Sequence, residues 1–167
     1  MEVLILTGAC GVGKTTLARA WARHKQGAVV ESDYFTEWIL KEDFPHWTRE
    51  EEIFTAKLAA RVALEYLRFP MPVAIENVWS PTGLELLRQM LAPDPLVRSL
   101  TFVWLECRLP ENQARDAQRP PSDQMGRRVA VVRQELQAYD WPEYVRRVDS
   151  SGLSVCETLR TIEDLEE

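Results

Sequence analysis

The sequence contains little cysteine and little histidine, and this scarcity excludes two classes of small protein. Three cysteines, Cys10, Cys107 and Cys156, are spread over 167 residues, together with two histidines. The cysteines form no C-x-x-C pair, and their odd number cannot complete a disulfide scheme, so we expect reduced thiols. His24 and His46 have no carboxylate or cysteine companions at metal-ligand spacing. The pattern therefore predicts no structural metal site.

Long apolar runs and basic runs are missing as well. The first apolar run, residues 3–6, is too short for a signal-sequence core or a membrane span, and no cationic stretch precedes it. Acidic residues outnumber basic ones, 26 to 20, and no basic stripe interleaved with aromatic residues resembles a nucleic-acid footprint. We therefore expect a cytoplasmic protein that binds neither membranes nor polymeric nucleic acid. A monomer and a homodimer both remain open.

The composition is typical of one α/β domain. A chain of 167 residues with 46% apolar residues can form one core and has little length for a second, so we expect a single domain over residues 1–167. Apolar β-rich runs alternate with helical stretches, which favours a parallel sheet with crossover helices. The expected strands are residues 3–7, 28–31, 72–76, 100–106 and 145–149. The expected helices are residues 15–26, 49–67, 82–91, 111–118, 125–138 and 155–164.

The second expected helix has the clearest helical spacing. Mostly apolar residues recur in it every three or four positions and form a broad stripe along the helix. We interpret this stripe as the face that packs on the core. The stripe consists of Ile53, Phe54, Lys57, Leu58, Ala60, Arg61, Val62 and Leu64.

The most specific motif runs from Gly8 to Thr15 and matches G-x-x-x-x-G-K-[ST] in full, directly after an apolar run and before a helical stretch. This is the pattern of a phosphate-binding P-loop. Its glycines let backbone N–H groups turn inward around phosphates, Lys14 reaches the β- and γ-phosphates, and Thr15 is able to ligate Mg²⁺. The expected nucleotide contacts are Gly8, Cys10, Gly11, Val12, Gly13, Lys14, Thr15 and Thr16.

Cys10 lies inside this loop and admits two interpretations. Neighbouring N–H groups at a helix terminus favour a thiolate, which would suit a redox role. The alternative, which we prefer, is that a small residue simply fills the space there.

Two acidic residues, Asp33 and Glu76, follow the second and third expected strands. Ligands of an open parallel sheet collect beyond the carboxyl ends of its strands, so both carboxylates should point toward the P-loop. Phosphoryl transfer to a hydroxyl needs one group to take or orient the hydroxyl proton and another to hold Mg²⁺ directly or through water. We assign these roles to Asp33 and Glu76 respectively. The alternative is that either residue only caps the next helix.

Arginines gather between the fourth and fifth expected strands, around a polar, turn-prone segment with Pro120 and Pro121. In a P-loop enzyme, a mobile lid at this place brings guanidinium groups over the transferring phosphate. We therefore predict a lid at approximately residues 115–128, with a solvated basic surface as the alternative for any single arginine. The cluster comprises Arg108, Arg115, Arg119, Arg127, Arg128 and Arg133.

Aromatic residues are concentrated after the second strand. They suit a ring-bearing or partly apolar ligand better than a highly charged sugar acid. They are equally compatible with a hydrophobic cover for the edge of the sheet. The expected pocket residues are Tyr34, Phe35, Trp38, Phe44, His46 and Trp47, with Trp79 opposite.

Taken together, these features resemble the small P-loop kinases, which include gluconate and shikimate kinases, chloramphenicol phosphotransferase, and the zeta-toxin-like and polynucleotide-kinase-like domains. The resemblance rests on the P-loop, Ser32-Asp33, Glu76-Asn77, the strand end at residues 105–111 leading to the arginines, and the closing segment 148–154. It spans nearly the whole chain, although only the P-loop is highly specific.

The resemblance implies a three-layer α/β/α sandwich with a five-stranded parallel sheet of order 2-3-1-4-5 and a lid, using ATP and Mg²⁺. By position, Asp33 resembles the acceptor-side aspartate, and Arg115 and Arg119 resemble adenine-stacking and lid arginines that also act in catalysis. The turn containing Ser150 and Gly152 resembles the loop that borders the adenine. Glu76 departs from the more usual aspartate of the family.

The function expected from the sequence is that of an ATP-dependent kinase. It would transfer the γ-phosphate to a hydroxyl of a nucleoside-like, antibiotic-like or metabolite-like acceptor. The alternative is a nucleotide-binding regulatory ATPase module that acts through a protein partner. A regulatory GTPase is disfavoured because the Asn-Lys-x-Asp signature is missing from the sequence.

Overall fold

The computed structural model describes residues 1–165 and contains one sheet of five strands, β2-β3-β1-β4-β5 in spatial order. The strands are β1 (Glu2–Thr7), β2 (Ala28–Glu31), β3 (Val73–Glu76), β4 (Ser99–Glu106) and β5 (Val145–Asp149). All four strand pairings are parallel. Both the five strands and the order expected from the resemblance are confirmed.

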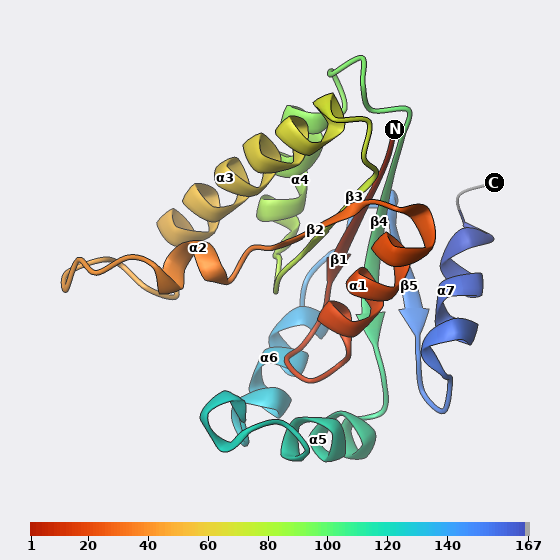
Figure 1. Cartoon of the computed structure of the whole chain (residues 1–167). Helices are drawn as coiled ribbons and strands as arrows, with labels where there is room; N and C mark the ends of the chain where they lie inside the picture. The colour runs from red at the N-terminus through yellow and green to blue at the C-terminus, as the bar shows by residue number, and fades with distance from the viewer. Residues whose placement is uncertain (166–167) are drawn as a thin grey trace.

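Helices cover both faces of this sheet and give it three layers (Figure 1). One face packs against α3 (Arg49–Arg68) and α4 (Pro81–Leu91), and the other against α1 (Lys14–Lys25) and α7 (Val155–Glu163). Because side chains alternate across a strand, Val3 and Ile5 of β1 join the core on the α3–α4 face, whereas Leu4 and Leu6 join the core on the α1–α7 face.

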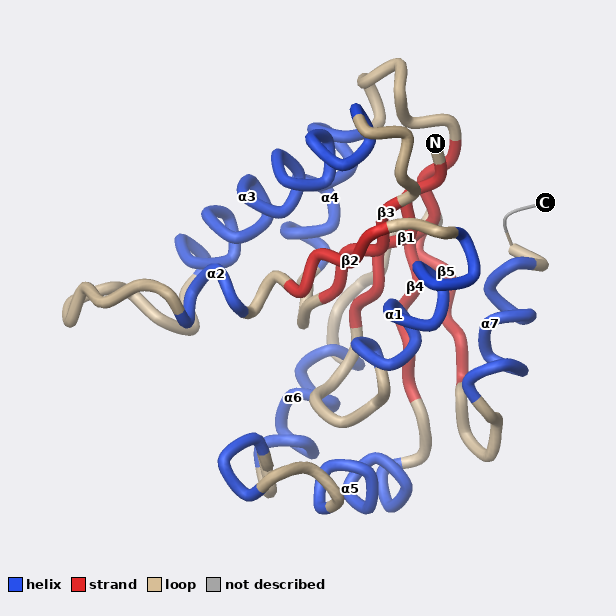
Figure 2. The backbone as a smooth tube through the Cα atoms, viewed as in Figure 1, coloured by secondary structure: helices blue, strands red, loops and turns tan. Residues whose placement is uncertain are grey.

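The remaining helices lie beyond the carboxyl ends of the strands. They are α2 (Tyr34–Glu37), α5 (Leu109–Ala117), the short 3₁₀ helix η1 (Pro121–Asp123) and α6 (Arg128–Gln137). Figure 2 shows that the P-loop and the loops that follow β2 and β4 gather at this end of the sheet. Residues 38–47, between α2 and α3, project from the body of the protein, and we call them the arm. No helix among residues 1–165 is long and apolar enough to cross a membrane.

Two element boundaries differ from the expectation for identifiable reasons. Strand β3 begins at Val73 because Pro72 has no N–H to donate to a ladder, although its carbonyl accepts from Ala28 N at 2.8 Å. Helix α6 begins at Arg128 instead of residue 125. The N–H groups of Met125 and Gly126 donate to the Asp116 carboxylate, so this turn is held to α5.

The stripe predicted on α3 is wrong in phase. Of its eight residues only Ala60 is buried, and Phe54 is 40% exposed. The buried face instead consists mainly of alanines, which allow the helix to approach the sheet and α4 closely. The buried residues are Thr55, Ala56, Ala59, Ala60, Ala63 and Leu67.

Candidate nucleotide and acceptor site

The P-loop connects β1 to α1, and two of its glycines are required by close packing. Gly8 has φ 154, and a Cβ added there would lie 2.3 Å from the carbonyl oxygen of Leu105. Gly11 has φ 74, and its Cβ would lie 3.1 Å from both Asn112 Nδ2 and Asp116 Cβ of α5. Any side chain at Gly8 would collide with β4, and one at Gly11 would press on α5 in a backbone conformation that favours glycine. The loop is therefore seated directly on these two elements.

Lys14 and Thr15, at the start of α1, face the open side of this loop. The Lys14 ammonium donates to the carbonyl oxygens of Gly8, at 3.0 Å, and Ala9, at 3.2 Å. The Thr15 hydroxyl donates to Glu76 Oε1 at 2.8 Å. The structure thus brings together the predicted phosphate-binding lysine and both predicted metal-binding residues.

Glu76, at the end of β3, is buried, and its surroundings act on its charge. Loss of hydration raises the pKa of the Glu76 carboxyl, and the opposing effects of the Lys14 ammonium and the Thr15 hydroxyl do not cancel this. The next helix, α4, is capped by the Ser80 hydroxyl, which accepts from Thr82 N and Gly83 N. Glu76 is therefore not a helix cap, and its carboxylate lies beside Thr15.

Asp33 lies directly after β2 and does not cap α2 through its side chain. The residue is exposed, yet the protein around it removes enough hydration to raise the pKa of its carboxyl. The positive charges of Lys14 and Arg119 oppose this rise, so both lie within electrostatic range of Asp33. The carboxylate thus stands at the cleft between the P-loop and the predicted lid.

Arg115 of α5 joins the back of the P-loop to the turn after β5. Its guanidinium donates to the Val12 carbonyl at 3.0 Å and to the Ser150 hydroxyl and carbonyl, both at 3.4 Å. Glu111 pairs with the same guanidinium at 2.5 Å and also accepts from Gly152 N at 3.2 Å. The three residues predicted at the adenine side, Arg115, Ser150 and Gly152, therefore form one cluster.

The predicted lid, residues 115–128, is braced internally. The buried Asp116 carboxylate accepts from Gly126 N at 2.8 Å and lies 3.6 Å from the half-exposed Arg119. Gln124 donates to the carbonyls of Ala117, at 3.1 Å, and Arg119, at 2.8 Å. These contacts hold the turn at residues 124–126 to the carboxyl-terminal end of α5.

The other arginines of the cluster do not converge on one point. Arg108 is largely exposed beside Glu111, and Arg127 is exposed at the end of the predicted lid. Arg128 stacks on the Trp47 ring, at 4.7 Å from its centroid, and Arg133 donates to the Cys107 carbonyl.

The predicted acceptor-pocket aromatics split into two groups on the arm side. Tyr34, Phe35 and Trp38 contact one another around α2, and Phe44 contacts His46 and Phe54 near the start of α3. Of these rings, only Phe35 packs against the core cluster. The alternative prediction, a hydrophobic cover for the edge of the sheet, therefore applies to Phe35 and not to the other rings of these two groups.

Trp79 does not belong to this pocket, and its assignment there is wrong. The side chain is completely buried in the core beneath α3 and α4. Its backbone is fixed by Thr7, whose hydroxyl accepts from Trp79 N at 2.9 Å and donates to Trp79 O at 2.8 Å. These two hydrogen bonds hold the chain after β3 so that Trp79 enters the core and does not reach the carboxyl edge of the sheet.

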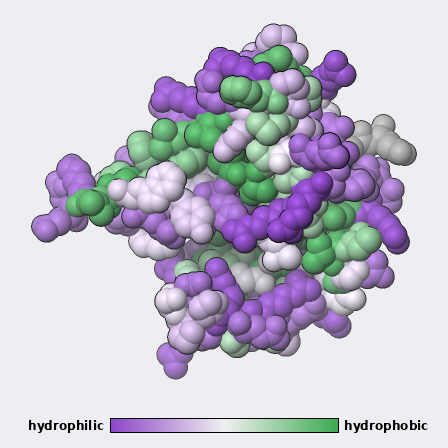
Figure 3. All heavy atoms as spheres, in the orientation of Figure 1, coloured by the Kyte–Doolittle hydropathy of each residue, from purple (hydrophilic) through white to green (hydrophobic). Residues whose placement is uncertain are grey.

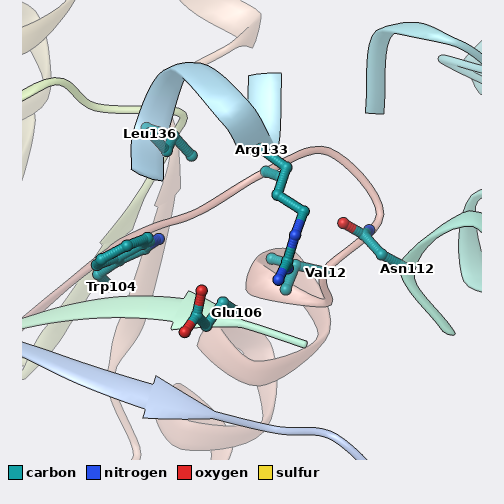
Figure 4. A pocket seen from close by; sticks show the side chains of 7 residues that line it. Val12, Trp104, Glu106, Asn112, Arg133 and Leu136 are labelled. Atoms are coloured by element: carbon teal, nitrogen blue, oxygen red, sulfur yellow. The ribbon is translucent and has the colours of Figure 1, made fainter. Parts of the chain in front are cut away.

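Cys10 packs against the apolar cluster of Trp104, Val132 and Leu136, and its carbonyl accepts from Asn112 Nδ2 at 2.6 Å. Next to it lies a small cavity of ≈ 10 Å³, enough for about one water molecule, so it is not a substrate site. Glu106 Oε2 and Asn112 Oδ1 are buried nearby without a partner in the described chain. The lining residues, shown in Figure 4, are Ala9, Val12, Trp104, Glu106, Asn112, Arg133 and Leu136.

Two residues of this site, Asn112 and Asp116, were missed by the sequence reasoning. They lie one turn apart on the face of α5 that packs behind Gly11. Their i,i+4 spacing places both on one helix face, but only the packing of α5 shows that this face is the buried one.

The whole arrangement is a cleft at the carboxyl end of the sheet. In Figure 3 a recess separates the arm side from the α5–α6 side of the molecule. The P-loop with Lys14 and Thr15, the acids Asp33 and Glu76, and Arg119 of the lid all belong to the elements around it.

Comparisons with known proteins agree with this architecture. No protein-family model and no curated protein sequence matches the chain. Among solved structures, an unliganded sugar kinase from a Janibacter species is 17% identical with TM-score 0.71, covering 98% of this chain and 94% of its own.

Two further structures have the same fold. The APS kinase of Mycobacterium tuberculosis, in complex with AMPPNP and APS, is 16% identical with TM-score 0.65 and covers 99% of this chain and 98% of its own. A gluconokinase from Sinorhizobium meliloti is 17% identical with TM-score 0.59, covering 98% and 95%. The chain therefore has the fold of the small P-loop kinases.

Proposed function

We propose that this protein is an ATP-dependent phosphotransferase that moves the γ-phosphoryl group of ATP to a hydroxyl of a small acceptor. The observation that carries the proposal is that Thr15 at the start of α1 donates to Glu76 at the end of β3, while Lys14 of the same helix lies within electrostatic range of Asp33, after β2. The likeness to solved kinases supports it through the fold.

Each residue has a definite part in the transfer. The N–H groups of the P-loop and the Lys14 ammonium bind the phosphates, and Arg115 fixes the loop between Val12 and Ser150 beside the nucleotide base. Arg119 contributes a positive charge from the predicted lid. This charge stabilises the negative charge that develops on the phosphates during transfer.

Asp33 orients the acceptor. Its carboxylate, free of a capping role, accepts the proton of the attacking hydroxyl. The acceptor oxygen then bonds the γ-phosphorus while the bond from that phosphorus to the β,γ-bridging oxygen breaks. ADP leaves, and the proton passes from Asp33 to solvent.

Thr15 and Glu76 fit Mg²⁺, since they present two hard oxygen donors within 2.8 Å of each other. When bound, the ion would neutralise phosphate charge. Glu76 would contact the ion directly or through a bound water molecule. Glu76 replaces the shorter aspartate usual at this place in the resembled family, and its extra methylene extends the reach of the carboxylate.

The acceptor side belongs to the arm and α2. Exposed Tyr34, Trp38 and Trp47 suit a ring-bearing acceptor, because flat apolar groups gain from contact with aromatic faces. The candidates are nucleoside-like, antibiotic-like and other hydroxyl compounds.

A screen of hydroxyl compounds, read by ADP release with ATP and Mg²⁺, tests the proposal. We expect at least one compound to raise ADP release well above the basal rate, and Asp33→Asn to abolish most of that increase. A chain that binds ATP and shows no acceptor-dependent release would instead support a regulatory ATPase module. Nucleotide-dependent binding of a protein partner would identify that second function.

A further inference from the structure

Trp47 combines exposure with backbone strain. It lies at the end of the arm, is 78% exposed, and has φ 59, in the left-handed region that bulky residues rarely adopt. Burial in the core therefore does not hold this conformation in place. Strained residues of this kind persist where local structure fixes them, and they gather at binding sites.

Polar contacts fix the position of the ring. The Glu51 carboxylate accepts from Trp47 N and lies 3.2 Å from His46 Nδ1. The Thr48 hydroxyl caps α3 by accepting from Glu51 N at 3.3 Å. The start of α3 thus fixes the backbone from which the indole extends at the surface.

The face of this indole is already occupied by a flat cation. The guanidinium of Arg128, the first residue of α6, lies 4.7 Å from the ring centroid. The contact crosses the cleft, from the arm to the end of the predicted lid. Aromatic faces attract cations and flat groups, so Arg128 itself indicates the chemistry that the Trp47 face accepts.

The same residues connect Trp47 to the proposed acceptor base. Glu51, which holds Trp47 N, is close enough to Asp33 for its charge to help raise the pKa of that carboxyl. Glu51 therefore joins the end of the arm that carries Trp47 to the surroundings of Asp33.

We propose that the Trp47 face is the acceptor-specificity subsite, that Arg128 covers it in the absence of acceptor, and that the acceptor carries a flat ring or a cationic group which replaces this guanidinium. The inference rests on the proposed function and names the substrate class of the same site.

The charges on the arm side disfavour an anionic acceptor. The first turn of α3 contains Glu50, Glu51 and Glu52, so protein carboxylates already meet the positive end of the helix dipole. Arg49, exposed at the first position of the same helix, is the basic side chain of this turn, and Arg128 on the indole face is the cation that the acceptor replaces. Sugar acids and nucleoside monophosphates would lie beside this acidic turn and Asp33.

Two substitutions separate a subsite from a merely structural contact. Trp47→Leu removes the platform, so KM for the acceptor should rise about 2–30-fold, the equivalent of a cation–π or stacking contact. Arg128→Gln removes the cover, so KM should fall about 2–5-fold. A structural contact would shift KM in the same direction in both variants. Arg61→Gln, exposed on α3 and outside the arm, serves as the control and should leave KM unchanged.

Matched probes test the charge preference. Glucosamine and gluconate have similar size and opposite charge, and thymidine and thymidylate differ by one phosphate. With ATP and Mg²⁺, we expect acceptor-dependent ADP release for glucosamine or thymidine to exceed that for its anionic counterpart at least tenfold. Arg49→Gln should not alter this preference.

Failure of the inference differs from failure of the proposed function. Preferred turnover of gluconate or thymidylate, or KM shifts of the same sign in Trp47→Leu and Arg128→Gln, would overturn the inference and leave the kinase proposal standing. If calorimetry shows ATP binding and neither these four probes nor any compound of the hydroxyl panel raises ADP release, both proposals are overturned together.

Discussion

The two sides of the cleft are held in place by different means. On the nucleotide side, the P-loop is seated on β4 and α5, with Gly8 against Leu105 and Gly11 against Asn112. On the acceptor side, the arm extends from β2, an edge strand with one neighbour, and exposes Trp38, Leu40 and Trp47. The proposed phosphate site is thus built into the packed core, whereas the proposed acceptor site depends on an exposed segment.

The largest expected effect lies on the nucleotide side. Lys14→Ala should abolish turnover and weaken binding of ATP with Mg²⁺, because the ammonium is the point charge that meets the transferring phosphate. Calorimetric titration measures the binding, and Arg23→Ala on the exposed side of α1 is the control. Since Lys14 donates only to two loop carbonyls, its loss should not unfold the chain. Wild-type binding no tighter than that of Lys14→Ala would refute the P-loop assignment.

Asp33→Asn should impair transfer to the acceptor and leave ATP binding intact. We expect transfer to fall by roughly 10²–10⁴, the usual range of general acid–base help, with ATP affinity nearly unchanged. Steady-state ADP release and calorimetry together separate the two effects. Loss of ATP affinity would place Asp33 at the metal instead, and full retention of transfer would leave it without a part in the reaction.

Binding of nucleotide should protect the predicted lid from proteolysis, an effect of intermediate size among these predictions. Tryptic cleavage after Arg127 or Arg128 should slow severalfold when ATP and Mg²⁺ are added, because charge-assisted contacts to phosphate order the segment. Cleavage at Lys57 or Arg61, both exposed on α3, should stay the same. Equal rates at the lid with and without nucleotide would mean that these arginines form a static surface.

Glu76→Gln should have the smallest of these effects, and the effect is on the thermal stability of the protein. Because the folded protein raises the pKa of Glu76, the native state binds more protons than the unfolded chain, and stability falls as pH rises from the ordinary glutamate range through the raised value. The uncharged variant should therefore melt a few degrees higher than wild type at neutral pH without metal, where 1 kcal/mol is worth roughly 2–4 °C.

This difference should disappear in acid, where wild-type Glu76 is protonated as well. Thermal denaturation between acidic and neutral pH measures it, while the variant should need more Mg²⁺ for turnover. A variant less stable than wild type at every pH would show that the hydrogen bond with Thr15 outweighs the cost of burying the charge.

The strands and the P-loop could be predicted because each depends on local sequence. The buried face of α3 could not be predicted, because apolar residues occur on all sides of this helix and their spacing does not select one side. Close packing selected the alanines at 56, 59, 60 and 63. Trp79 follows β3 as a ligand-edge residue would, and only the distant Thr7 turns it into the core.

The predicted positions of Lys14, Thr15, Glu76 and Asp33 follow from strand order, because the carboxyl ends of parallel strands meet at one edge. The supporting residues do not. Asn112 and Asp116 look like solvent-facing helix positions in the sequence, yet both are buried behind the P-loop and hold polar groups of other segments. Their roles emerge only from the packing of α5.

The attachment of the arm to an edge strand has a consequence for exchange between proteins. Strand β2 pairs with β3 alone, and the segment that follows it joins α3 at Thr48, the cap of that helix. Residues 32–48 therefore form one continuous cassette, whose two ends are a strand terminus and a helix cap. Transplanted into another chain of the same fold, such a cassette could carry its substrate preference with it, while the recipient kept its own machinery for ATP.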